Sequence, residues 1–305
     1  MIFKIITEDD LSEVLNIPLG RLKEIARDIN KHYRFTKIRT GKKNKLRDTF
    51  IAKPELRRIH DSININILDK IDFPIEIRGG VRGRSVSSNA SVHQNKINIA
   101  CFDIKDFYPS TPPAKVFRSF TSIGISPKPA RLLTRLVTLD SLPIGFATSP
   151  KLSALVLIKL SRRIKNFVKK FNVEHSIWID DLTLSGNYPL KKLRSGIKTI
   201  VKDEGYRLNE EKTEFRYRRQ PQFVNSINVN GELTATKERV ERVKLAIHIS
   251  KKYGIKSYIN KHEPGTTVDE LKRKMAGRLG NLMSINRSKY EKLKKEWKDV
   301  VKASI

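Results

Sequence analysis

The stretch SIWIDDLTLSG, residues 176–186, sets two neighbouring acids inside an apolar run with the residue types of a β-strand. Side chains alternate faces along a strand, so in one flat strand Asp180 and Asp181 would point in opposite directions. We therefore expect a hairpin, with one strand up to Ile179, a tight turn at the acids and a second strand from Leu182. Two carboxylates at such a turn repel each other unless basic side chains or a metal ion lie between them.

The charge balance points to a polyanionic partner. The 305 residues include 62 Lys and Arg against 32 Asp and Glu, a formal net charge of +30. Any single basic cluster, such as RYRR, is usually a solvated face. The excess over the whole chain instead favours nucleic acid, ahead of an anionic membrane surface. At this length we expect two or three subdomains.

Several classes of protein are excluded. One cysteine, Cys101, allows neither an internal disulfide nor a cysteine-based zinc site. No apolar run is long enough to span a bilayer. The N-terminus, MIFKIITEDDLSEVL, turns acidic too early for a signal peptide. We therefore expect a cytoplasmic protein with no membrane contact.

A second acidic block, CFDIKDFYPS, begins within the strand-like run INIACFDI, residues 97–104. If that strand neighbours the hairpin, Asp103 converges with Asp180 and Asp181. Clustered oxygen ligands suit Mg²⁺, and two such ions about 4 Å apart can activate a 3′-hydroxyl and stabilise a leaving pyrophosphate. Each acid alone would more often pair with Lys or Arg in a structural network. Asp106, in the same block, is expected to be a surface or capping acid.

The spacing of apolar residues predicts the remaining elements only coarsely. Residues 33–52 alternate like a hairpin with a basic, glycine-containing turn, whereas residues 78–96 are rich in Gly, Ser and basic residues and are predicted mainly as loop. Residues 150–171 form the clearest amphipathic helix, apolar on one face and basic on the other. Further helices are expected within 111–140, over about 190–204 and through most of the chain after Gly231.

Five blocks, in order, resemble the sequence blocks of reverse transcriptases: FDIKDFYPS, LPIGFATSPKLSA, WIDDLTLSG, RLNEEKTEF and QFVNSINVNG. The opening third looks like the start of bacterial retron reverse transcriptases. NASVH, residues 89–93, matches the NAxxH element that marks retron enzymes, and VNS, residues 224–226, lies where those enzymes commonly carry VTG. Each motif is short, but the ordered set covers nearly the whole chain.

The resemblance implies an α+β fold, the right-hand polymerase of fingers, palm and thumb, with an antiparallel palm sheet and a basic helical thumb. It places N-terminal helices and fingers at 1–95, with a retron-type loop at 79–95. The palm would span 96–230, with inserted helices at 111–140. The thumb, which binds RNA and heteroduplex, would span 231–305.

The resemblance also implies the residues of the site. Asp103, Asp180 and Asp181 match the catalytic acids, and with the Ile104 carbonyl they would bind two Mg²⁺ ions. The expected nucleotide-binding residues are Arg47, the aromatic gate Tyr108, Gly145 and Lys212. The expected RNA-binding residues are Asn89, His93, Arg278 and Lys289. Lys43 and Lys45, in the fingers hairpin, are equally consistent with a solvated turn.

As a member of this family the chain would be an enzyme, an RNA-directed DNA polymerase. A retron enzyme copies part of a cognate structured noncoding RNA into single-stranded DNA from dNTPs. Priming from a guanosine 2′-hydroxyl leaves msDNA, a branched RNA–DNA hybrid. The resemblance further implies antiphage defence together with a separate effector protein.

Three departures keep other readings open. Trp178 replaces the tyrosine of the YxDD box, Ile144 replaces the glutamine of LPQG, and Asn225 with Ser226 replaces the last two residues of VTG. One alternative is another bacterial reverse transcriptase, of the group II intron or defence-associated type. A second alternative is an RNA-binding scaffold whose polymerase site is vestigial.

Overall fold

A computed structural model of the chain describes residues 4–40 and 45–303, so the predicted turn with Lys43 lies outside the described residues. The chain forms two compact units. The first contains the residues up to Val86 together with Ala100–Phe215, and the second contains Ser87–Ile99 together with the residues from Arg216 onward. Helices combine with antiparallel strands in each unit, which confirms the expected mixed composition. The division into fingers, palm and thumb stays a prediction.

The first unit is built on a four-stranded sheet in the order β4-β5-β3-β6. Its strands are β3 (Asn98–Asp103), β4 (Glu174–Trp178), β5 (Asp181–Gly186) and β6 (Glu214–Tyr217). Strands β4 and β5 pair antiparallel, with Trp178 opposite Asp181, which confirms the predicted hairpin. The turn consists of Ile179 and Asp180, so Asp181 already belongs to the second strand.

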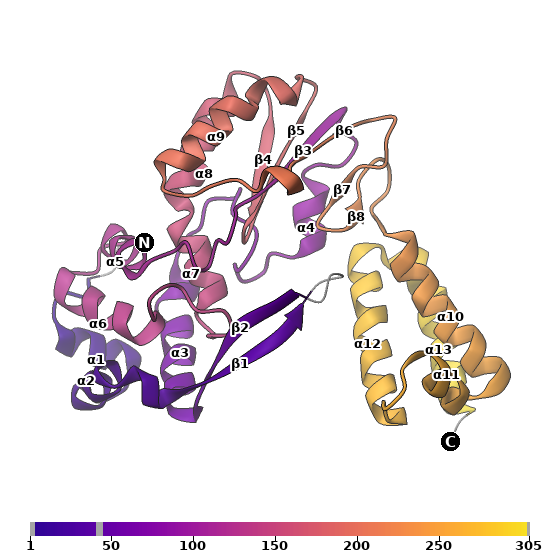
Figure 1. The fold of residues 1–305 in the computed structure, drawn as a ribbon, viewed down its shortest axis with the longest axis horizontal. Coiled ribbons are helices and arrows are strands. Elements are labelled where there is room, and N and C mark those ends of the chain that lie inside the picture. Colours follow the sequence, from indigo (N-terminus) through magenta and orange to yellow (C-terminus); the bar gives the residue numbers. More distant parts are fainter. Residues whose placement is uncertain (1–3, 41–44, 304–305) are drawn as a thin grey trace. The chain divides into compact units, whose positions relative to one another are not determined.

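Helices cover this sheet (Figure 1). Helix α8 (Ile158–Lys169) packs on β4, and α9 (Arg194–Asp203) packs on α8. The single helix predicted for 150–171 is in fact two, because α7 (Ser149–Val156) ends at Leu157, where φ is −91° and ψ is 0°. Helix α7 is buried along most of its length, whereas α8 is exposed on its basic face. The apolar pattern predicted helix correctly but could not show this break.

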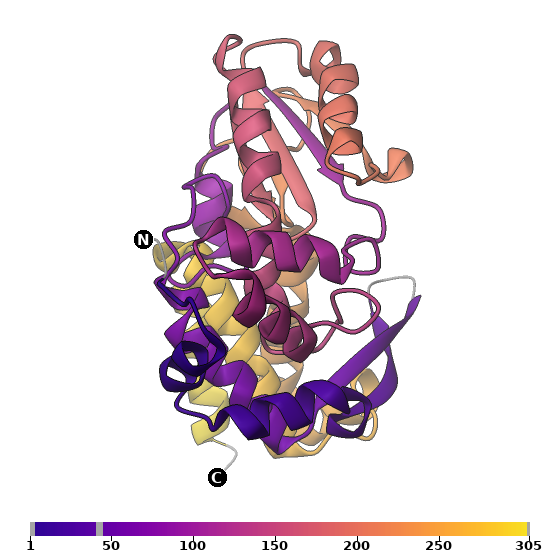
Figure 2. The same ribbon diagram turned by 90° about the vertical axis from the view of Figure 1, so that its left-hand side faces the viewer.

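The rest of the first unit is a helical layer from which a two-stranded ribbon extends (Figure 2). The ribbon pairs β1 and β2 antiparallel, with Phe35 opposite Phe50 and Ile38 opposite Arg47. Proline at the first turn begins α3, α5 and α6. The elements are α1 (Glu8–Leu15), α2 (Leu19–Arg27), β1 (Tyr33–Thr40), β2 (Lys45–Ala52), α3 (Pro54–Asn66), α5 (Pro113–Ser122) and α6 (Pro127–Val137). Short 3₁₀ helices are η1 (Ile29–His32), η2 (Leu68–Lys70), η3 (Leu190–Leu193) and η4 (Glu210–Lys212).

The second unit joins a small sheet to a set of helices. The predicted loop at 78–96 contains a short helix, α4 (Val86–Ser91), and the segment 87–99 packs with the C-terminal part of the chain. The sheet has the order β7-β8-β9. The elements are β7 (Phe223–Val224), β8 (Ile227–Asn228), β9 (Thr234–Ala235), α10 (Lys237–Tyr253), α11 (Ile255–His262), α12 (Val268–Ile285) and α13 (Arg287–Lys302). No helix within 4–40 or 45–303 is long and apolar enough to cross a bilayer.

Candidate active site

The structure brings Asp103 and Asp180 together. Strand β3 ends at Asp103, and the next residue, Ile104, donates its N–H to the carbonyl of Asp180 at 2.9 Å. On the other side of β3, the Asn209 N–H donates to the carbonyl of Asp103 at 2.8 Å. These backbone bonds hold the strand end beside the hairpin turn. The Asp103 residue is 9% exposed, so its carboxylate has little water around it.

The turn that carries Asp180 has an unusual backbone. Ile179 has a φ of +60°, in the left-handed region that β-branched residues rarely occupy. Such a conformation costs free energy and persists only where the surrounding structure holds it, often at functional sites. The position of Asp180 therefore depends on what packs against Ile179.

The two acids are short of positive charge. Burial raises the pKa of Asp180, and the neighbouring charge of Asp103 raises it further. Lys212 opposes this effect by donating from Nζ to Asp103 Oδ1, and that hydrogen bond raises the pKa of Lys212. Arg47, from strand β2, also lowers the pKa of Asp180. The site thus favours additional cationic charge.

Tyr108 lies at the same site. Burial raises the pKa of its hydroxyl to about 12, and the Asp180 charge acts in the same direction. Ser153 on α7 acts in the opposite direction and lowers the pKa of Tyr108. No sequence signal identified Ser153 beyond its place in the SPKLSA block. The Tyr108 ring meets Phe107 edge to face, with centroids 5.5 Å apart. The ring therefore packs on Phe107 and lies within reach of the Asp180 charge.

Residues 17–252 match the reverse transcriptase (RNA-dependent DNA polymerase) family. The chain belongs to the reverse transcriptase family. It is therefore an RNA-directed DNA polymerase, as the order of its motifs predicted.

Curated relatives are retron reverse transcriptases. Retron Se72 reverse transcriptase of Salmonella heidelberg (strain 579083-10) is 31% identical over 257 residues, 81% of this chain and 68% of that protein. Retron Mx65 reverse transcriptase of Myxococcus xanthus is 26% identical over 79% of this chain and 62% of its own. Retron Ec86 reverse transcriptase of Escherichia coli is 28% identical over 78% of this chain and 76% of its own. The resemblance to bacterial retron enzymes is thus confirmed.

In this reverse transcriptase, Gly145 lies against strand β2. Its φ is +104°, and a Cβ there would lie 2.6 Å from the Phe50 carbonyl and 2.8 Å from the Thr49 methyl. The Phe50 N–H donates to the Ile144 carbonyl at 2.8 Å. Strand β2 therefore occupies the space that a side chain at position 145 would fill. A nucleotide contact at Gly145 stays a prediction.

The two named residues of the retron-type motif NASVH are buried in this reverse transcriptase. Asn89 and His93 are both 0% exposed, and Asn89 Nδ2 donates to Asn225 Oδ1 at 2.6 Å. The NAxxH and VNS motifs therefore contact each other within the second unit. Binding of RNA by Asn89 and His93 stays a prediction, but buried side chains reach RNA only if their surroundings move.

The two predicted RNA contacts of the C-terminal helices differ from each other. Arg278 on α12 forms an ion pair with Glu263 at 2.6 Å, so part of its charge is already satisfied. Lys289 on α13 is exposed. Only Lys289 presents an exposed side chain to a ligand as the structure stands.

The donor set around Asp103 fits a hard divalent cation only in part. Asp103 and Asp180 supply adjacent carboxylates, the ligand type that Mg²⁺ prefers. Across residues 4–40 and 45–303, however, no group of three or more His, Cys, Asp or Glu side chains is arranged to hold a metal ion. Asp103, Asp180 and Asp181 all act on the pKa of Lys212, and binding of Mg²⁺ by these three acids stays a prediction.

Proposed function

We propose that this reverse transcriptase is a retron enzyme that copies part of a cognate structured noncoding RNA into single-stranded DNA and leaves it as msDNA. The observation that carries the proposal is the pairing of Asp103 with Asp180, through the Ile104 N–H and the Asp180 carbonyl at 2.9 Å. The similarity to retron reverse transcriptases of Salmonella, Myxococcus and Escherichia supports the retron assignment.

In this proposal Asp103 and Asp180 would hold Mg²⁺, with the Ile104 carbonyl and Asp181 as further oxygen donors. Two bound Mg²⁺ ions would activate the attacking hydroxyl and stabilise the leaving pyrophosphate. The closeness of the two acids supports this role, because neighbouring carboxylates repel each other unless a cation lies between them. Lys212 neutralises Asp103 while no cation is bound.

Three further residues would position the nucleotide. Arg47 on β2, which already influences Asp180 and Tyr108, would neutralise the triphosphate. The Tyr108 ring, fixed by Phe107 and burial, would exclude a ribonucleotide 2′-hydroxyl by contact. Gly145 would keep the β2 backbone close to the nucleotide pocket.

The rest of the proposal concerns the whole protein. Residues 1–95 would supply the fingers and residues 96–230 the palm. Residues 231–305, with helices α10–α13, would form a thumb whose Lys and Arg contact heteroduplex phosphates. Asn89, His93, Arg278 and Lys289 would serve RNA recognition, directly or through packing. We further propose 2′-hydroxyl priming, a cytoplasmic location and antiphage defence together with a separate effector protein. The net charge of +30 supports the RNA partner.

Primer extension on the cognate RNA with dNTPs and Mg²⁺ tests the polymerase site. Asp103→Asn and Asp180→Asn should each reduce synthesis by more than the roughly 10- to 100-fold that loss of an outer-shell partner costs. The matched control is Asp106→Asn, since Asp106 is exposed in the same sequence block. Wild-type synthesis by Asp180→Asn would refute the assignment, and RNA binding without synthesis by the unmodified chain would indicate a scaffold.

Sequencing the DNA that copurifies with the protein tests the retron assignment separately. A short, unique DNA joined to RNA through a 2′ branch is the expected product. A heterogeneous, unbranched product would indicate another type of reverse transcriptase.

A further inference from the structure

Residues 73–84, here called the strap, run beside the hairpin that carries Asp180. The Ile177 N–H donates to the Glu76 carbonyl at 2.8 Å, and the Ile177 carbonyl accepts from Arg78 and Gly79 at 2.7 and 3.1 Å. Ile77 and Ile177 form a parallel bridge. The strap therefore pairs with the outer side of β4, immediately before the turn.

The strap touches the turn through a glycine. A Cβ at Gly79 would collide with the backbone nitrogen of Ile179 and would lie 2.9 Å from Trp178 Cα. At Gly80, where φ is +73°, a Cβ would collide with the carbonyl of Pro150 at the start of α7. Only glycines allow the strap to pass between the turn and α7, so the strap is in direct contact with the strained residue.

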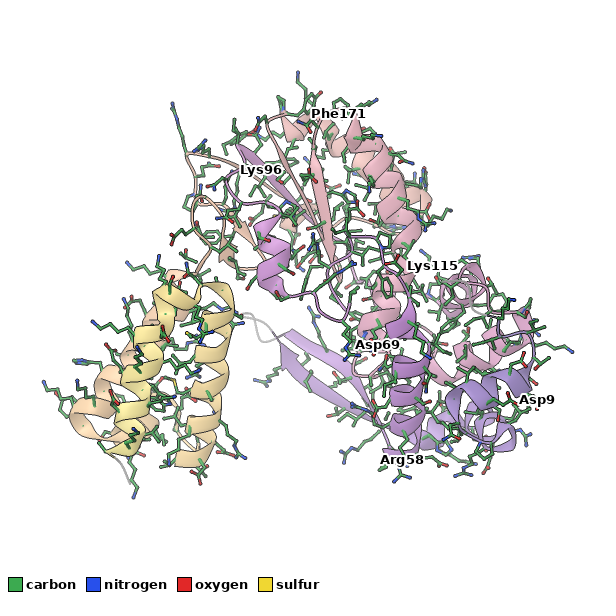
Figure 3. All side chains as sticks on the ribbon, turned by 180° about the vertical axis from the view of Figure 1, so that it is seen from behind. Asp9, Arg58, Asp69, Lys96, Lys115 and Phe171 are labelled. Carbon is green, nitrogen blue, oxygen red and sulfur yellow. The ribbon has the colours of Figure 1, made fainter. Side chains whose placement is uncertain are left out.

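Helix α7, on the other side of the strap from the turn, forms an ion pair with the segment before the strap. Asp69, labelled in Figure 3, follows α3 and pairs with Lys151 on α7 at 2.6 Å. The side chains of both are largely buried, at 14% and 20% exposed. This ion pair therefore joins α7, against which Gly80 packs, to the segment that precedes the strap.

Arg84 closes that bend. Its guanidinium donates to the carbonyls of Phe73 at 2.8 Å and Pro74 at 2.6 Å, and also to that of Ile77. One planar group with several donors can hold three carbonyls at once, which a lysine ammonium matches only loosely. Burial lowers the pKa of Arg84, consistent with an enclosed position. Arg82, two residues earlier, is exposed.

We propose that Arg84 is a positioning residue of the polymerase site. By holding the bend of the strap, it keeps Gly79 against the Ile179 backbone and so keeps Asp180 beside Asp103. The inference rests on the proposed catalytic role of Asp180. A displacement of about 1 Å in such a group can cost on the order of 100-fold in rate, so a residue that touches no substrate can still control turnover.

Arg84→Gln, Arg84→Lys and the matched control Arg82→Gln test this inference. For Arg84→Gln, kcat should fall roughly 10- to 100-fold, as for loss of an outer-shell partner, while KM for dNTP and RNA affinity stay within about twofold of wild type. Arg84→Lys should recover part of the loss, and Arg82→Gln should leave kcat unchanged. Loss of RNA affinity in parallel with kcat would contradict the inference.

A second measurement uses the protein without metal or nucleotide. Amide hydrogen exchange should become faster at Ile104, whose N–H bonds Asp180, and at Ile177 in Arg84→Gln, but not in Arg82→Gln. If Arg84→Gln does not fold, Gly79→Ala provides the test, because it displaces the turn directly and should give the same pattern. Unchanged exchange at both sites in folded Arg84→Gln or Gly79→Ala would overturn the inference. Synthesis retained by Asp180→Asn would instead refute the proposed function.

Discussion

At the scale of single residues, two histidines are buried in the first unit. His60 Nε2 lies 2.8 Å from the Leu136 carbonyl, which can only accept, so Nε2 carries the proton. Its ring packs on Phe146, with centroids 4.7 Å apart. His175 Nε2 lies 3.2 Å from Ser161 Oγ. Burial lowers the pKa of each histidine to about 4.

These pKa values predict loss of stability in mild acid. The unfolded histidines take up protons near pH 6.5 while the folded ones do not, so their contribution is complete above pH 6.5. It falls as the pH drops towards 4, by roughly 3 kcal/mol for each histidine. Denaturant unfolding between pH 7 and pH 4.5 measures the slope. His60→Gln should flatten it, whereas His248→Gln, on an exposed face of α10, should not.

The sequence allowed the meeting of Asp103 and Asp180 to be predicted, because both follow apolar strand-like runs and acids at neighbouring strand ends converge. It did not reveal that Asn89 and His93 are buried. A short polar motif has the same sequence whether it lies in a solvated loop or in a packed helix. The burial of Asn89 and His93 depends on residues more than a hundred positions away, such as Asn225. Arg84 was missed because an arginine in a basic loop normally indicates a solvated charge.

At the scale of elements, Gly145 sets the contact between its loop and the β1–β2 ribbon. Gly145→Ala should destabilise the protein by several kcal/mol, because φ is +104° and the new Cβ would lie 2.6 Å from the Phe50 carbonyl. Gly20→Ala, inside α2 with no atom within 4 Å of its Cβ, should stabilise by about 0.5–1 kcal/mol. Denaturant midpoints measure the stabilities of the two variants. Similar shifts for both would contradict the claim that the close approach of Gly145 to strand β2 requires glycine.

The β7–β8 turn offers a second prediction. Asn225 and Ser226 both have positive φ, +46° and +63°, as the two-residue turns favoured in hairpins require, with glycine preferred at the second position. Ser226→Gly should therefore raise the free energy of unfolding by about 0.5–1 kcal/mol. Ser226→Ala keeps the strain and serves as the control. Equal midpoints for the two variants would rule out backbone strain as the cause.

Element types were predictable where periodicity was strong, and their limits were not. The amphipathic pattern over 150–171 gave no sign of the break at Leu157, because apolar residues continue without interruption from Ala154 to Ile158. We predicted the hairpin turn at Asp180 and Asp181, one residue later than the observed turn at Ile179 and Asp180. Adjacent acids are common in turns, and the apolar Ile179 indicated strand. Helix α4 was missed because Gly- and Ser-rich flanks favour loop, and its stability comes from packing.

At the scale of the whole molecule, the charge of +30 predicts steeply salt-dependent RNA binding. Affinity for the cognate RNA should fall at least about 100-fold between 50 and 200 mM salt, because each neutralised phosphate releases counterions. Filter binding without Mg²⁺ measures the slope. Lys289→Ala should reduce that slope by about one, whereas a flat dependence in the unmodified protein would exclude phosphate contacts as the main source of affinity.

The division into two compact units was not predictable from the sequence, whereas the expected fingers, palm and thumb borders stay a prediction. The second unit takes one piece from the middle of the chain and one from the end, Ser87–Ile99 and the residues from Arg216. Composition hardly changes at 87 or 99, so no signal marks the insertion. The association of the two pieces shows instead in hydrogen bonds such as that from the Gln222 side chain to the Ile97 carbonyl at 3.0 Å.

That interleaving has a consequence for synthesis on the ribosome. Asn225, the partner of Asn89, is 136 residues further along, so at bacterial or eukaryotic translation speeds it emerges roughly 7 to 27 seconds later. During this interval Asn89 lacks its hydrogen-bond partner Asn225, while residues already synthesised can begin to fold. The NASVH segment must therefore stay unpaired until Asn225 has been synthesised. This delay makes the segment a point for chaperone engagement or early misfolding.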